Sequence, residues 1–413
     1  MTDLVDYQEQ TQVNAGLFVK SAPRIVLTFM IIQFVGLFMY GGFRTVYPII
    51  LEFSFNFTEQ EVISSWAIIY SIGLIIAFST RIPMGIIADR YSRLRSLSFG
   101  SLLCIASLVG TLYTKNIFVL ALLFGLLRTG VHIFPLVSRG YVGETNPARQ
   151  GRLNGLILLA GNTGSLLGPI LLATLLEISL PWLIWLSCGI LLVNNLLFAL
   201  NVPPGSKSTI MTLKSRLWIS IAEIWKLKTI VLVFTVSGVV NGINETVQVP
   251  YAHYALGLTP AETGFFVGLV QLSSIIIIFI SGESIDKFGV NNLIILGTGL
   301  EAIAGMLFLL ATKNLLIFFI SQILLQGGIL VIITASVTAI TLKVSRSTVS
   351  RSTISTSFGI ATSFFFLGSA LVPYIAGELY LVDARFPYLA IFMICILVIL
   401  LYCLSFIREK LKN

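Results

Sequence analysis

A long apolar segment of this sequence ends in the stretch Gly85-Ile86-Ile87-Ala88-Asp89-Arg90-Tyr91-Ser92-Arg93-Leu94-Arg95, which brings glycine, aspartate and arginine together. A second apolar segment ends in a related stretch 197 positions later, Gly282-Glu283-Ser284-Ile285-Asp286-Lys287-Phe288-Gly289. Both copies have a glycine, an aspartate four residues on and a base directly after it. The repeat indicates that the chain is built from two related halves.

The chemistry of this stretch suits a contact that forms and breaks. Glycine has no side chain, so a neighbouring helix can approach closely there, and the aspartate one turn further lies on the same helical face. A carboxylate at that place can accept hydrogen bonds from the N-terminal amides of another helix or from an arginine. The alternative is an ordinary basic loop at a membrane surface, which the second copy disfavours. We therefore predict a conformational role for Gly85, Asp89, Arg90, Arg93, Gly282, Asp286 and Lys287.

The composition is that of an integral membrane protein. Of 413 residues, 56% are hydrophobic and 11% are charged, and the mean hydropathy of +0.95 is far above that of a soluble domain. Apolar runs long enough to cross about 30 Å of hydrocarbon predict an all-α protein with twelve transmembrane helices. They lie near 25–51, 62–87, 96–114, 117–139, 153–176, 181–200, 229–255, 262–282, 292–311, 315–342, 354–376 and 386–407.

The basic residues outside these spans gather on one side of the predicted membrane. Only Lys115, Lys313 and Arg385 fall on the other side, and this bias predicts that both termini are cytoplasmic. The net charge of +8 therefore reflects topology, and we expect no nucleic-acid partner. Residues 1–22 are polar and lack a cleavable apolar core, so we expect a short disordered tail and no signal peptide.

The chain divides at a polar, basic stretch after Asn201, where Val202-Pro203-Pro204-Gly205 breaks the helix. Apolar residues keep helical spacing further along this stretch, which indicates an amphipathic helix on the inner membrane surface; a soluble protein-binding helix is the alternative. We predict a tail (1–22), a six-helix bundle (23–201), a connector (202–228), a second six-helix bundle (229–407) and a short tail (408–413).

The halves also match in their spans and outer turns. Arg44-Thr45-Val46 aligns with Glu245-Thr246-Val247 at an offset of 201, and Thr58 and Glu61 align with Thr259 and Glu262 at the same offset. Leu126-Leu127-Arg128 likewise aligns with Leu324-Leu325-Gln326 at an offset of 198. These matches indicate that the two halves are repeats of one another.

The two loops, the span count and the half-to-half spacing together resemble the major facilitator superfamily of secondary transporters. The resemblance implies two pseudo-symmetric six-helix bundles in the cell membrane, with a cargo site near the midplane lined by helices 1, 4, 7 and 10. Ser92 stands where that family usually has glycine, and Val290 and Asn291 stand where the second base would fall. We call the contact that each loop would form and break a latch, and we predict that the second loop forms the weaker one.

Polar side chains form stripes on these same four spans. Their steps of three, four and seven residues put them on one face of each helix. The predicted cargo-binding residues are Gln33, Tyr40 and Arg44 in the first span, Arg128 and His132 in the fourth, Asn241, Asn244, Glu245 and Gln248 in the seventh, and Gln326 in the tenth.

Five charged residues lie well inside spans: Arg44, Arg81, Arg128, Glu245 and Glu301. Each unpaired charge at the bilayer centre costs about 2.5–3.5 kcal/mol, so five would cost on the order of 12–18 kcal/mol, more than a typical stability of about 5–15 kcal/mol. They must pair or face water. For three of them the alternatives are cargo binding and a structural ion pair, whereas Arg81 is expected to support the Asp89 loop and Glu301 has no predicted role.

The leading hypothesis is a secondary transporter that moves a small organic anion by alternating access, coupled to protons. Arginine suits a carboxylate or phosphate because its planar guanidinium donates two hydrogen bonds at once. Arg44 and Arg128 would bind the anion, with His132 beside them and Glu245 as proton carrier or gate. In a second hypothesis the protein exports amphipathic or cationic compounds, with Glu245 attracting the cation and the arginines structural.

A membrane enzyme or sensor on this scaffold is a third possibility, which the sequence disfavours. It contains no Walker loop, no cluster of zinc-type ligands and only two histidines, His132 and His253. The four cysteines lie in apolar spans, where they serve as small core residues. We expect no cofactor and no metal; the expected partners are small-molecule cargo, protons and lipid, and the protein is expected to be a monomer.

Overall fold

The computed structural model describes the backbone of residues 2–90, 93–145, 150–201, 228–310, 313–346 and 354–410. Within these ranges it leaves undescribed the side chains of residues 2–24, 82, 85–86, 88–90, 139–145, 150–152, 154, 278–286, 340–346, 354–361 and 403–410. The predicted amphipathic connector helix lies outside the described residues.

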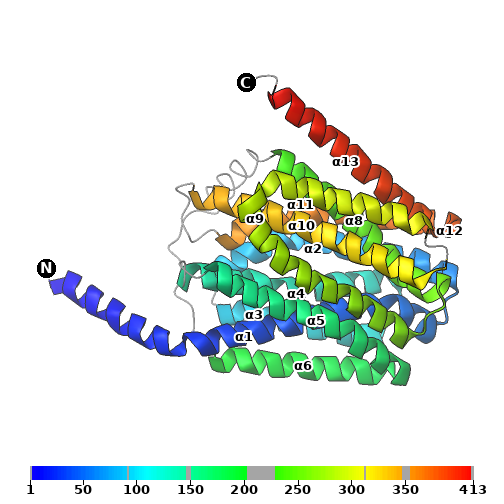
Figure 1. Ribbon diagram of the computed structural model, residues 1–413. Helices are drawn as coiled ribbons and strands as arrows, with labels where there is room; N and C mark the ends of the chain where they lie inside the picture. The colour runs from blue at the N-terminus through cyan, green and yellow to red at the C-terminus, as the bar shows by residue number, and fades with distance from the viewer. Residues whose placement is uncertain are drawn as a thin grey trace.

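Helices account for the secondary structure of the described residues, and no strand occurs among them (Figure 1). They are α1 (Thr2–Phe55), α2 (Glu59–Arg90), α3 (Arg93–Leu112), α4 (Ile117–Thr145), α5 (Gln150–Ile178), α6 (Leu180–Asn201), α8 (Lys228–Pro250), the π-helix η2 (Tyr251–Ala255), α9 (Pro260–Leu310), α10 (Leu315–Arg346), α11 (Ile354–Leu371), α12 (Pro373–Val382) and α13 (Phe386–Lys410).

The predicted membrane spans are confirmed. In the described part of the chain, 11 helical segments are long and apolar enough to cross a membrane, and Phe386–Tyr402 is a shorter apolar one. Each coincides with one predicted span, because length and hydropathy are what the bilayer selects. The backbone of residues 2–22, where the sequence predicted a disordered tail, belongs to α1, which begins at Thr2. Good helix formers such as Leu, Gln and Ala recur in this segment.

The second signature stretch bends the chain at a single glycine. α9 runs through both predicted spans of residues 262–311, with a non-helical backbone at Gly289 (φ 74°, ψ 162°). A positive φ of this kind is strained for residues with a side chain, so glycine is favoured there. In the first half α2 ends at Arg90 and α3 begins at Arg93, so both copies stand at a helix exit.

Close glycine contacts recur at comparable places in the two halves. A Cβ atom at Gly164 of α5 would lie 2.1 Å from the carbonyl oxygen of Phe34 in α1. A Cβ atom at Gly368 of α11 would lie 2.0 Å from the carbonyl oxygen of Thr235 in α8. Small residues of this kind let membrane helices pack backbone against backbone. α1 and α5 of the first half thus pack against each other as α8 and α11 of the second half do.

Gly164→Ala should lower the stability of the protein by about 1–3 kcal/mol, as expected for an overpacked site, because the added methyl group meets backbone rather than a movable side chain. Thermal unfolding in detergent measures this. The matched control is Gly155→Ala in the same helix, where a Cβ atom meets nothing within 4 Å. The control should leave stability unchanged or raise it by up to about 1 kcal/mol; equal losses in both variants would contradict the packing argument.

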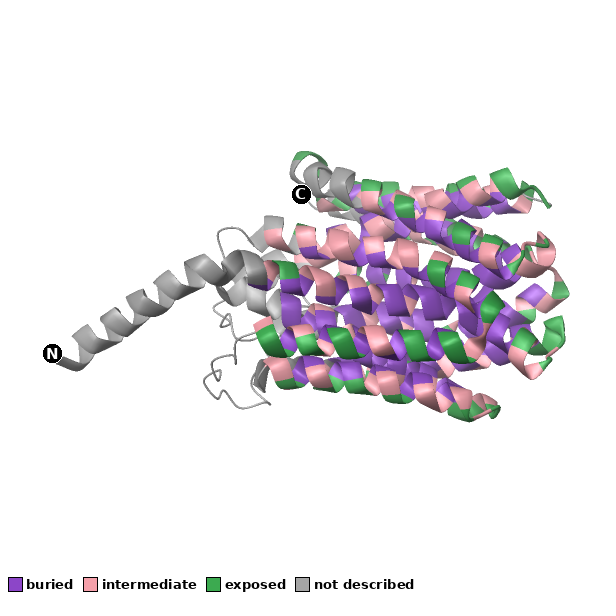
Figure 2. Ribbon diagram, turned by 90° about the horizontal axis from the view of Figure 1, so that it is seen from below, coloured by how far each residue is buried: buried purple, intermediate pink, exposed green. Residues whose placement is uncertain are grey.

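The turn after α1 and the turn before α9 lie at one end of the bundle, which we call the outer end because the charge bias predicts that it faces away from the cytoplasm. Towards this end the halves are in contact. A Cβ atom at Gly264 of α9 would lie 2.4 Å from the Pro169 carbonyl oxygen of α5, and the Ser71 hydroxyl of α2 donates to the Ala370 carbonyl of α11 at 3.0 Å. Buried residues lie in the interior and exposed ones on the outward faces (Figure 2).

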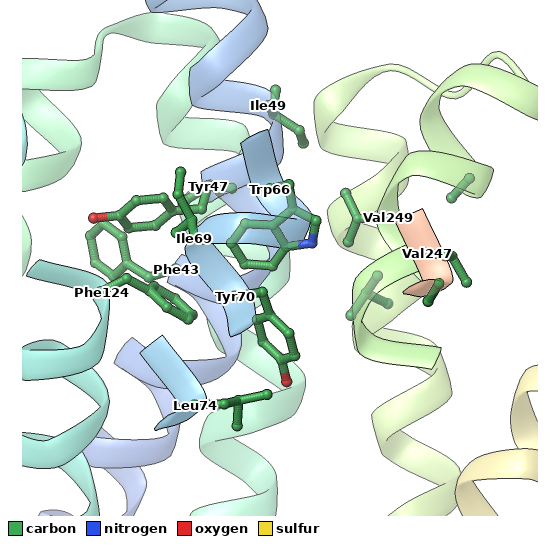
Figure 3. Packing of buried hydrophobic residues seen from close by; sticks show 14 of the residues in the cluster. Phe43, Tyr47, Ile49, Trp66, Ile69, Tyr70, Leu74, Phe124, Val247 and Val249 are labelled. Carbon is green, nitrogen blue, oxygen red and sulfur yellow. The ribbon is translucent and has the colours of Figure 1, made fainter. Parts of the chain in front are cut away.

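Aromatic packing fills the core of the first half beside this interface. Phe124 of α4 contacts the rings of Trp66 and Tyr47 edge-on, with centroids 5.4 and 5.1 Å apart. Figure 3 shows Trp66 and Tyr70 of α2 on the side of the cluster that faces Val249 of α8. Aromatic pairs in this geometry add to the gain from burial, so this cluster holds α1, α2 and α4 in fixed positions around the polar groups described next.

Candidate functional site

The centre of the bundle holds an ion pair between the halves. The Arg44 guanidinium of α1 donates from Nη1 to Oε1 of Glu245 in α8, and both side chains are buried. The Tyr40 hydroxyl, one turn before Arg44, donates to Oε2 of Glu245 at 3.2 Å. The structure confirms that the equivalent positions 44 and 245 face each other, because α1 and α8 adjoin the axis that relates the halves.

Arg128 of α4 completes this charged group. Its Nη2 atom lies 3.8 Å from Oε2 of Glu245. Three rings from three helices enclose the guanidinium, whose central carbon is 4.8 Å from the centroid of Tyr40 and 5.2 Å from those of Tyr70 and Phe366. Cation–π attraction of this kind is strongest in desolvated sites. The rings hold the charge in place while leaving its N–H edges available.

Several buried polar atoms around Arg128 have no hydrogen-bond partner among the described residues. They are Nε and Nη1 of Arg128, Nε2 of His132 and the hydroxyl of Tyr70. The His132 ring lies against Tyr40 and Phe366, with centroids 5.8 and 5.0 Å away. Buried polar groups are normally hydrogen-bonded, so this cluster has the donors that a polar molecule would need.

The remaining predicted cargo residues are distributed more widely. Asn244 accepts a hydrogen bond from Gln322 of α10 at 2.9 Å, which joins two helices of the second half. Gln33 is buried beside Gly161 of α5, roughly 16 Å along the helix from Arg44, so the structure does not bring it to the cluster. Asn241 and Gln248 are buried and Gln326 is partly buried.

The predicted latch residues are mostly beyond what the structure describes. The burial and contacts of Gly85, Asp89, Arg90, Gly282 and Asp286 lie outside what the structure describes, while Arg93 is partly buried and Lys287 is exposed.

Arg81 was expected to support the first loop, and the structure gives it a contact across the interface. Its Nε atom donates to the Thr362 hydroxyl of α11 at 3.0 Å, and its guanidinium lies 4.3 Å from the Phe366 ring.

Glu301, for which the sequence predicted no role, is buried within the second half. Its carboxyl accepts a hydrogen bond from the Ser237 hydroxyl of α8 at 3.0 Å and lies 3.5 Å from the Cys395 sulfur of α13. Cys104 takes the place of Glu301 in the first half: a Cβ atom at Gly130 would lie 2.6 Å from the Cys104 sulfur, as one at Gly328 would lie 2.7 Å from Cγ of Glu301. Among the described residues, no group of three or more side chains suits a metal ion.

Sequence reasoning missed the aromatic walls of the cluster. Tyr70 of α2 and Phe366 of α11 enclose Arg128, although the resemblance assigned the cavity to helices 1, 4, 7 and 10. That assignment is incomplete, because α2 and α11 pack against each other at the interface and their inward side chains reach the centre. No periodic polar pattern marked them, since aromatic residues in an apolar helix look like core.

Comparisons with known proteins agree on one family. A family model described as Major Facilitator Superfamily matches residues 29–249 and 238–413. Among solved structures, a mutant of the nucleoside transporter NupG has a TM-score of 0.72 at 13% identity, covering 92% of this chain and 100% of its own. The human organic anion transporter MFSD10 (TETRAN) has a TM-score of 0.69 at 15% identity, covering 92% and 99%. A mutant of the peptide transporter POT, in complex with alafosfalin, has a TM-score of 0.69 at 13% identity, covering 91% and 93%. None of the curated proteins compared with the chain matches it.

Proposed function

Because this chain belongs to the major facilitator superfamily and is therefore a membrane transporter of small molecules rather than an enzyme, we propose that its cargo is a small organic anion. We further propose that protons drive the transport and that it proceeds by alternating access. The proposal includes a monomer in the plasma membrane with both termini in the cytoplasm.

The observation that carries the proposal is the charge balance of the central cluster. Arg44 and Arg128 supply two positive charges and Glu245 one negative charge, all buried. A buried net charge is costly in a membrane unless a counter-charge joins it. An anion with a planar carboxylate, or a phosphate, would neutralise the excess and meet the unpartnered N–H groups of Arg128.

The solved relatives agree with a small organic cargo without choosing among classes. MFSD10 is named an organic anion transporter, NupG a nucleoside transporter and POT a peptide transporter. At 13–15% identity these likenesses establish the fold alone, so the anion proposal rests on the arginines.

Glu245 gives a physical route for proton coupling. Its carboxylate competes with an anion for Arg44, because both require the same donors. Protonation of Glu245 would release Arg44 to the cargo, and loss of that proton would restore the ion pair and favour cargo release. One proton would then accompany each anion in the same direction, which is symport.

Uptake and counterflow in liposomes test this function. The panel consists of monocarboxylates, dicarboxylates, phosphate esters, sugars and lipophilic cations, each with and without a pH gradient. We expect transport of one anion class, accelerated when the side from which the anion enters is the more acidic. Transport of lipophilic cations without anions would favour the second hypothesis, in which Glu245 attracts the cargo and the arginines are structural.

Asp89→Asn should slow the exchange between outward-open and inward-open states while leaving cargo affinity nearly intact, because Asp89 stands at a helix exit away from the polar stripes. Asp286→Asn should be milder, since Arg90, Arg93 and Arg95 follow the first aspartate whereas only Lys287 follows the second. Equilibrium binding and turnover, measured together, check both. A large loss of binding, or equal defects in the two variants, would contradict the unequal latch.

A further inference from the structure

A second contact between the halves lies nearer the outer end than the Arg44–Glu245 pair. Nε2 of His253 in η2 is 2.8 Å from Oε2 of Glu52 in α1, and the Tyr254 hydroxyl donates to the same oxygen at 3.0 Å. The other ring nitrogen of His253, Nδ1, lies 2.6 Å from the Leu258 carbonyl oxygen. Glu52 and His253 are 201 positions apart, the offset that also relates Arg44 to Glu245.

The hydrogen-bond partners determine how many protons this contact holds. The Leu258 carbonyl can only accept, so Nδ1 must carry a proton. A neutral ring then presents its lone pair at Nε2, and an ionised Glu52 would present another lone pair 2.8 Å away. The contact is favourable only if one more proton lies between them, on Nε2 as an imidazolium or on the Glu52 carboxyl.

We propose that Glu52 and His253 form a proton-binding site that closes the outer end of the transporter when a proton is bound. The ligand is the proton itself, and the two halves each supply one side of the site. The site lies eight residues along α1 from Arg44, roughly 12 Å, and is separate from the proposed cargo cluster.

The sign of the pH dependence follows from the proton count. The closed contact requires the bridging proton, whereas Glu52 and His253 that have separated into water have no such requirement. The closed form thus binds more protons than the open form. Acid at the outer end should favour closure, and a rise in pH should favour opening.

Titratable and charged groups of both signs lie near this contact. Tyr254 donates to Glu52, while Glu59 of α2 and Tyr380 of α12 lie near enough to interact electrostatically with Tyr254 or with each other. Lys115, from the turn after α3, lies over the Phe55 ring at 5.8 Å. Arg385 is paired with Asp383. Glu59 adds negative charge, which favours the protonated contact.

Spin-label distances across the outer end test the proposal independently of cargo. Labels are placed on the full chain at Ile178→Cys and Val382→Cys, which are exposed and belong to different halves, with the native cysteines replaced by serine. Between about pH 5 and pH 8, the otherwise unmodified protein should shift from a short distance toward a longer one. Tyr254→Phe is the matched control, because it removes a hydrogen bond to the same oxygen but no ionisable bridge, and it should keep this pH response.

Amide substitutions separate a proton site from a merely structural contact. Glu52→Gln and His253→Gln should each abolish most of the pH response, because a glutamine amide at either position can donate to the remaining partner without the bridging proton. The double variant can form an amide–amide hydrogen bond without an ionisable proton, so it should close at every pH in the range. A double variant with the same pH response as the unmodified pair would overturn the proposal, and so would a distance that does not change with pH before substitution.

Discussion

Arg44→Gln and Glu245→Gln should each reduce transport by roughly two to four orders of magnitude, and the double variant should recover part of that loss. Each single change leaves its partner as an unpaired charge in a buried site, which costs about 3–5 kcal/mol. The Arg44–Glu245 pair joins the halves where they meet, so this cost falls on the outer-closed form. Removing both charges removes the penalty and leaves a neutral contact.

A double-mutant cycle measures the coupling, on transport rate and on labelling of a cysteine introduced between the halves on the outer side of the Arg44–Glu245 pair. Coupling below about 0.5 kcal/mol, with Glu245→Gln losing only the response to a pH gradient, would reject the gate and leave Glu245 as proton carrier. A double variant no better than Arg44→Gln would instead assign Arg44 to the anion alone.

The exposed pair Asp383–Arg385 provides the control for this cycle. Hydrogen bonds from Arg385 lower the pKa of the Asp383 carboxyl to about 2, and the two side chains are 2.6 Å apart. Exposed pairs typically contribute about 0.2–1 kcal/mol. Arg385→Gln should therefore leave transport nearly unchanged.

Arg128→Gln should lower affinity for the transported anion at least 100-fold. The guanidinium is buried, and two of its N–H groups have no partner among the described residues. Hydrogen bonds from a charged donor contribute about 1.5–3 kcal/mol each, so losing two of them accounts for a loss of this size. Arg128→Lys should recover only part, because an ammonium keeps the charge but not the planar set of donors.

Equilibrium binding of the best anion from the liposome panel measures this loss. Lys228→Gln, which removes a positive charge from an exposed position at the start of α8, is the control and should bind normally. If Arg128→Gln binds the anion as well as the unmodified protein does, Arg128 is structural, and the positive excess of the cluster no longer supports an anionic cargo.

Helix periodicity and the repeat predicted the central ion pair of the candidate site, but they did not predict which polar residues lie at the same level along the helices. Arg44 and Glu245 could be paired in advance because their positions are equivalent in the two halves, and the structure confirms the contact. Gln33 shares the helical face of Arg44, yet it lies several turns away. A period of 3.6 residues specifies the face of a side chain but not which partners stand at its level in the membrane.

Residues recruited by packing could not be predicted from pattern alone. Tyr70 and Phe366 enclose Arg128 only because α2 and α11 meet at the interface, and an aromatic residue in an apolar helix carries no sign of this. His253 lies near the end of its span, where polar residues are common, so the residue by itself did not suggest a contact. Its offset of 201 from Glu52 equals the offset between the two halves, and that offset could have predicted the pair.

The meeting of equivalent positions has a consequence for the ancestry of the chain. If the halves were identical subunits related by a twofold axis, each position beside the axis would face its own copy. Arginine would then meet arginine at position 44, and glutamate would meet glutamate at position 52. The complementary contacts exist because one polypeptide contains both halves, which allows them to differ. A charge change at Arg44 or Glu52 therefore calls for a matching change 201 residues later. During evolution, substitutions at these positions in one half are expected to be accompanied by compensating substitutions in the other half.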